Sequence, residues 1–127
     1  MMTLRSKKGV TLVELLAVIV ILGIIAAIAV PTIGGLLERT RQNAAEAEHT
    51  NILEAARLYA IAEDKTIFTL AEVIAADYIS LGANVYQGGD DVDIVNADIE
   101  FTWDGSSVSI SSPAGELKIN GYTVREP

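Results

Sequence analysis

Residues 7–16, KKGVTLVELL, place a short basic leader directly before a long apolar run. Every residue from Leu15 to Val30 is apolar or glycine, and the acid just before them is Glu14. A carboxylate in hydrocarbon costs a few kcal/mol, so Glu14 needs a positively charged partner. Cleavage between Gly9 and Val10 would create one, because the new amine of a neighbouring copy carries a positive charge.

The apolar run is long enough to cross a membrane. Residues 10–33 contain one charge, and at ~1.5 Å per residue they form a helix of about 36 Å, longer than a bilayer core of about 30 Å. The leucine, isoleucine and valine side chains favour insertion by about 3 to 7 kcal/mol, which outweighs one acid. Three basic leader residues, Arg5, Lys7 and Lys8, predict a cytoplasmic N-terminus and an external C-terminal part.

These residues resemble the class III leader of type IV pilins and pseudopilins. In that family a prepilin peptidase cuts after the leader glycine and methylates the new N-terminus. The resemblance implies cleavage between Gly9 and Val10, methylation of Val10, and an assembly salt bridge from Glu14 to the amine of an adjacent subunit. It also implies that Gly23 and Pro31 soften the helix. Val10 departs from the family, which more often has Phe or Met there.

Two other interpretations of the run stay open. A basic start, an apolar core and Ala27-Ile28-Ala29 also fit a secretory signal that releases a soluble binding domain. The length of the run and the acid inside it argue against that signal. A plain membrane anchor carrying a non-assembling domain explains the hydrophobicity but gives Glu14 no role.

Composition limits the classes of function. The chain has 127 residues, a mean hydropathy of +0.37 and a net charge of -8. An acidic body offers no electrostatic footprint for nucleic acid, so we expect no nucleic-acid partner. The chain has no cysteine, which removes disulfides and thiolate chemistry. Within the resembled family, a missing C-terminal disulfide loop is more typical of Gram-positive members or pseudopilins.

One long helix should extend from Thr11 to about Ala62, a length of roughly 78 Å. Such a helix is too long for a domain of this size, so half of it must project. Apolar and small residues recur at i, i+3, i+4 and i+7, the spacing of one helix face. Two such stripes are Ile33, Leu36, Leu37 and Thr40, then Ile52, Ala55, Ala56 and Tyr59.

The remaining chain predicts a short helix, a loop and a sheet. Thr69-Leu70-Ala71-Glu72 has the capping-box pattern that opens a helix. Residues 82–89 predict a connecting loop. From Val92 the apolar period changes to two, which indicates strands. We expect Val92 and Ile94 to add an edge strand, and Tyr122 and Val124 to extend the sheet at its other end.

Two turns set the predicted strand register. Asp104-Gly105 is a two-residue hairpin signal, which places Phe101 opposite Val108. Residues 112–115 form a four-residue loop that places Ile110 opposite Leu117. Both turns put apolar residues on one face, so we predict an antiparallel meander that packs on the second half of the helix.

No constellation for catalysis appears, and we predict no enzyme and no cofactor. His49 has no second histidine or cysteine near it in sequence, so we expect a solvated helix position. The serines between residues 106 and 112 should face solvent. A weak calcium hypothesis rests on oxygen ligands from one loop; its candidates are Asp90, Asp91, Asp93 and Asp98.

The prediction is an α+β pilin fold: a long N-terminal α-helix, half of it transmembrane, packed against a small antiparallel β-sheet. Residues 1–9 are the prepilin leader, 10–33 the transmembrane and filament-core helix, and 34–127 the head. The implied function is a structural subunit of an extracellular filament, with a minor pilin or a pseudopilin of type II secretion or DNA uptake as alternatives. The implied partners are other copies, prepilin peptidase, the pilus assembly platform, other pilins and, before assembly, the membrane.

Overall fold

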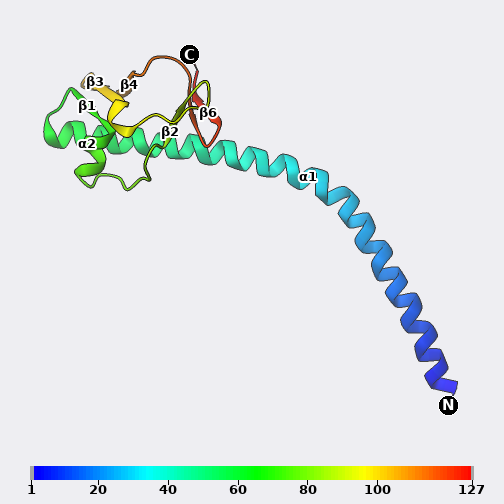
Figure 1. Ribbon diagram of the computed structural model, residues 1–127. Helices are drawn as coiled ribbons and strands as arrows, with labels where there is room; N and C mark the ends of the chain where they lie inside the picture. Colours follow the sequence, from blue (N-terminus) through cyan, green and yellow to red (C-terminus); the bar gives the residue numbers. More distant parts are fainter. Residues whose placement is uncertain (1, 127) are drawn as a thin grey trace. The chain divides into compact units, whose positions relative to one another are not determined.

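A computed structural model describes the main chain of residues 2–126 and the side chains of residues 11–126 (Figure 1). Helix α1 spans Met2–Glu63. The chain divides into two compact units, Met1–Arg39 and Thr40–Pro127. The described residues of the first unit all belong to α1, and the second unit contains the end of α1 and the sheets. The predicted α+β class is confirmed.

Eight short elements follow α1 in the second unit. They are β1 (Ile67–Thr69), α2 (Leu70–Ala75), β2 (Tyr86–Gly88), the 3-10 turn η1 (Asn96–Asp98), β3 (Glu100–Trp103), β4 (Val108–Ser112), β5 (Leu117–Ile119) and β6 (Tyr122–Arg125). The strands form two antiparallel sheets, in the orders β1-β3-β4 and β2-β5-β6.

The single predicted meander is therefore wrong. Strand β5 pairs with β2 and β6, while β4 pairs with β3, so Ile110 does not face Leu117. Residues 82–89 are not wholly a loop, because Tyr86 is completely buried and brings β2 into the fold. The predicted edge strand at Val92 and Ile94 is also wrong; only an isolated bridge joins Asp93 to Gln87. The predicted extension at Tyr122 and Val124 exists as β6.

The first hairpin has the predicted faces but a different register. Phe101 lies opposite Ile110 rather than Val108. The carboxylate of Asp104 accepts hydrogen bonds from the main-chain N–H groups of Ser106 and Ser107, at 2.8 and 2.7 Å. These bonds close a four-residue turn where we predicted two residues. A shift of two residues keeps each side chain on its face of the sheet.

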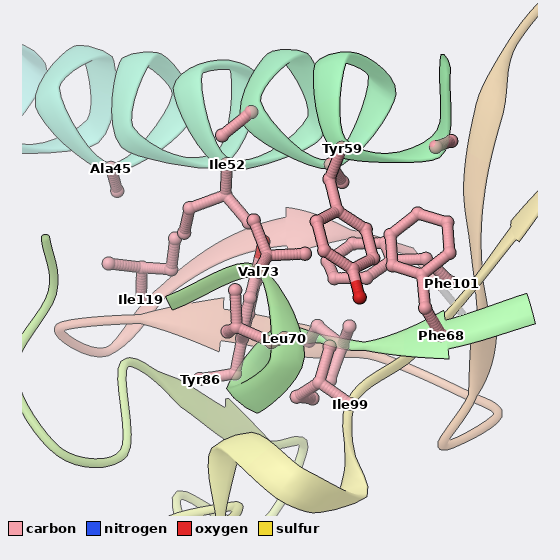
Figure 2. Packing of buried hydrophobic residues seen from close by; sticks show 14 residues of the cluster. Ala45, Ile52, Tyr59, Phe68, Leu70, Val73, Tyr86, Ile99, Phe101 and Ile119 are labelled. Atoms are coloured by element: carbon pink, nitrogen blue, oxygen red, sulfur yellow. The ribbon is translucent and has the colours of Figure 1, made fainter. Parts of the chain in front are cut away.

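Residues 40–63 of α1 supply one wall of the core. The predicted face is confirmed: Ile52, Ala55, Ala56 and Tyr59 are all buried. Figure 2 shows side chains of α1 pointing toward those of α2 and both sheets. The aromatic rings of Phe68 and Phe101 lie 5.6 Å apart, and Phe68 lies 5.0 Å from Tyr59. One apolar cluster thus joins the end of α1, α2 and strands of both sheets, and partly buried side chains of β4 and β6 pack against it.

The capping box is present as predicted. The main chain of Glu72 donates to the Thr69 hydroxyl, and the Glu72 carboxylate accepts from the Thr69 main-chain N–H at 2.7 Å. This reciprocal pair satisfies donors at the start of α2. The helix then buries Leu70 and Val73 against the core.

Arg125 connects the two sheets. Its guanidinium extends from β6 and donates to the carbonyls of Ile110 at 3.1 Å, Gly115 at 2.7 Å, and Pro113. These carbonyls belong to β4 and to the segment between β4 and β5. The arginine thus takes up carbonyl acceptors of β4 and of the segment that follows it, while β4 and β5 lie in separate sheets.

Candidate assembly surface on the long helix

The first unit leaves its apolar side chains uncovered. All side chains from Thr11 to Arg39 are exposed except that of Ala29, which is half-buried. Exposure of the large apolar side chains here ranges from 50% to 69%. They are Leu12, Val13, Leu15, Leu16, Val18, Ile19, Val20, Ile21, Leu22, Ile24, Ile25, Ile28, Val30, Ile33, Leu36 and Leu37. A contiguous apolar surface of this extent needs lipid or protein against it.

The earlier of the two predicted apolar stripes is not part of the core. Ile33, Leu36 and Leu37 are each at least half exposed. They lie in the first unit, whereas the core lies wholly in the second. Spacing alone could not separate these residues from the core face, because both stripes have the same helical period.

By length and composition α1 could span a membrane. Between Thr11 and Glu63 its most apolar window has a mean hydropathy of 3.0, and none of that window is buried. A helix that is apolar all round belongs in a membrane or in the interior of a larger assembly. The described side chains therefore support the predicted transmembrane helix.

Glu14 lies inside this surface. Its side chain is exposed, and it makes no hydrogen bond or ion pair among residues 11–126. Residues four apart lie on one helix face, so Glu14 and Val10 share a face of α1. Gly9 and Val10 have a helical main chain, but the Val10 side chain lies outside those that the structure describes.

The helix continues through both predicted softening residues. Pro31 lies inside α1, and nothing stands within 4 Å of a Cβ placed on Gly23. Pro31 has no N–H group, so the carbonyl of Ala27 loses its usual helical donor. One residue on, the hydroxyl of Thr32 donates to the carbonyl of Ile28 at 3.0 Å. Such bonding back to residue i−4 often bends helices.

The four aspartates of the calcium hypothesis have other partners or stand apart. Asp91 accepts from Lys118 Nζ at 2.9 Å, and Asp93 accepts from Gln87 Nε2 at 3.2 Å. Among the described residues, no three His, Cys, Asp or Glu side chains could hold a metal ion together. Asp90 and Asp98 therefore join no such group.

His49 is not the solvated residue that we predicted. It is half-buried, and its Nδ1 lies 2.8 Å from the hydroxyl of Tyr86 in β2. Burial lowers the pKa of His49, and the charge of Arg125 lowers this pKa further. The sequence signal that we missed is Tyr86 itself, an aromatic residue in a stretch otherwise typical of loops.

Two features therefore define the class: a small α+β unit, and an uncovered apolar helix long enough to cross a membrane, with Glu14 as its one acid between residues 10 and 33. The family model described as the prokaryotic N-terminal methylation motif matches residues 4–30. The match confirms the resemblance, and the chain carries the class III prepilin leader of type IV pilins and pseudopilins. Neither a curated protein nor a solved structure matches the chain significantly.

Proposed function

We propose that the chain is a structural subunit of an extracellular, type IV pilus-like filament. The observation that carries this proposal is the uncovered apolar helix, whose single acid between residues 10 and 33, Glu14, follows Gly9 by five residues. Residues 1–9 are the leader, residues 10–33 span the membrane before assembly, and residues 34–127 form the external head. The chain catalyses no reaction.

Cleavage between Gly9 and Val10 gives Glu14 its partner. The new amine at Val10 is positive, and Glu14 of a neighbouring subunit neutralises it. The two groups then leave lipid as a pair, which lowers the cost of an isolated carboxylate in hydrocarbon.

The same pair supplies registry between copies. Lipid tails are as apolar as leucine, so transferring α1 from bilayer to filament yields little hydrophobic free energy. Close packing of the exposed apolar side chains must hold the bundle together. The Glu14 pair then selects one axial offset between neighbours, because only one offset brings each acid to an amine.

Mass analysis of the mature N-terminus tests this proposal. The chain is expressed with a prepilin peptidase and its cell-associated form is purified. We expect a chain that begins at a methylated Val10. A chain that begins at Val30 would identify a secretory signal, and an intact Met1 would identify a plain anchor; either result would overturn the proposal. A Gly9→Leu variant, with its bulky residue before the cut, should keep its leader.

A further inference from the structure

The turn between β5 and β6 has a chemically labile sequence. Asn120-Gly121 is the only Asn-Gly pair in the chain. Both residues have positive φ, +51° and +80°, and they connect the paired residues Ile119 and Tyr122. Asn-Gly is the favoured sequence for such two-residue hairpin turns. Both residues of the turn are exposed.

An Asn-Gly pair can lose ammonia without an enzyme. The main-chain nitrogen of Gly121 attacks Cγ of Asn120, a bond forms between them, and the Cγ–Nδ2 bond breaks. The side-chain amide leaves as ammonia and takes the proton from the Gly121 nitrogen. Water then opens the five-membered imide at either carbonyl, giving Asp or isoAsp. Because glycine has no side chain, its main-chain nitrogen can approach the Asn120 side chain closely.

In the folded chain the Gly121 nitrogen is already a hydrogen-bond donor. The N–H of Gly121 donates to Oε1 of Gln87 at 2.9 Å. Nε2 of Gln87 donates in turn to Asp93 at 3.2 Å, which fixes the amide with its oxygen toward the turn. Pairing of Gln87 with Lys118 holds β2 beside β5. The acceptor therefore reaches the turn from a different strand.

We infer that Asn120 is a spontaneous deamidation site and that Gln87 retards the reaction by holding the attacking nitrogen as a hydrogen-bond donor. The reaction needs that nitrogen to give up its proton and turn toward the Asn120 side chain, and the hydrogen bond opposes both changes. The product matters locally, because Asn120 lines an open pocket with Arg41, Ala44 and Tyr122. Deamidation there places a new carboxylate in the same pocket as a cation. The inference is independent of filament assembly.

The test follows ammonia loss in the full chain, held in detergent micelles in mildly alkaline buffer. Trypsin releases residues 119–125, and mass spectrometry measures the deamidated fraction over time. We expect Gln87→Ala to accelerate the reaction about two- to tenfold, as removal of one exposed hydrogen bond predicts. Gln87→Glu keeps an acceptor and should react no faster than the unmodified sequence.

Gln42→Ala is the matched control. Gln42 also donates a side-chain hydrogen bond to this sheet, to the carbonyl of Thr123 at 3.1 Å, but it does not reach Gly121. The deamidation rate of Gln42→Ala should equal that of the unmodified chain. In urea, the unmodified chain and the three variants should deamidate at equal rates, all faster than the folded protein. The inference is overturned if Gln87→Ala reacts no faster, or if Gln42→Ala accelerates as much. Hydrogen exchange of the Gly121 amide gives a second readout, and this amide should lose protection only in Gln87→Ala.

Discussion

Glu14 is the only ionisable side chain between residues 10 and 33, and its role separates assembly from simple anchoring. Glu14→Ala should insert in the membrane and be cleaved, yet yield few filaments, because the amine of its neighbour loses its partner. Sheared surface filaments, quantified against total membrane-bound subunit, measure this effect. Glu54→Ala is the control, since it removes an exposed acid paired with Arg57 in the second unit. Equal yields from both variants would contradict a pairing role for Glu14.

His49 predicts a pH dependence of the second unit. Its folded-state pKa lies below the ordinary value because the ring is partly buried and the positive charge of Arg125 disfavours protonation. The unfolded chain therefore binds more protons at pH values just below about 6.5. The free energy of unfolding should fall as the pH is lowered through this window, and be unaffected by His49 at higher pH.

Urea unfolding measured across this window tests the His49 prediction. His49→Gln keeps a polar side chain opposite the Tyr86 hydroxyl but cannot titrate. Its stability should vary less with pH than that of the unmodified chain. The neighbouring carboxylate of Glu48 remains in both proteins, so it cancels in the comparison. Identical pH profiles would show that the histidine does not cause the dependence.

At the scale of elements, we predict that α1 is less stable between Gly23 and Pro31 than elsewhere. Pro31 removes one main-chain donor, and glycine costs about 1 kcal/mol relative to alanine inside a helix. Pro31→Ala and Gly23→Ala should each slow hydrogen exchange of the amides between these positions. Gly35→Ala is the control, because its Cβ also meets nothing within 4 Å but lies outside the segment. If all three slow exchange equally there, the softening is not local.

Sequence patterns predicted some elements well and their partners poorly. The buried face around Ile52 and the capping box at Thr69 were predictable, because both depend on residues within two helical turns. Strand β2 was not, because its anchor is one buried tyrosine, Tyr86, inside a polar and glycine-containing stretch. The hairpin register was off by two residues, since the Asp104 side chain stabilises a longer turn.

At the scale of the whole molecule, Arg125 couples the two sheets. It contacts three carbonyls from one guanidinium, and hydrogen bonds to a charged group contribute about 1.5 to 3 kcal/mol. Arg125→Ala should therefore lower the free energy of unfolding by about 2 kcal/mol. Arg57→Ala, which breaks an exposed pair with Glu54, should cost less than about 0.5 kcal/mol. Equal losses in urea titrations would refute the coupling role.

The division of the strands into two sheets could not be predicted from the sequence, for a physical reason. The turn sequences indicate which residues share a face of a sheet. They do not indicate which strands pair, because pairing also depends on residues far along the chain, such as Arg125, which donates to the Ile110 and Gly115 carbonyls. The exposed apolar helix was more predictable, because its signal is local: one acid five residues after a glycine, inside an apolar run. The prepilin leader was thus predictable from local sequence, within residues 4–30, whereas the strand pairing of the second unit was not.

The most direct test of filament assembly is a reconstruction of the assembled filament at side-chain resolution. We predict that the Glu14 carboxylate lies within about 4 Å of the Val10 nitrogen of a neighbouring subunit, the range of an ion pair. The apolar side chains of residues 12–30 should be covered by other copies of α1. A Glu14 carboxylate that faces solvent, far from every Val10 nitrogen, would contradict the account.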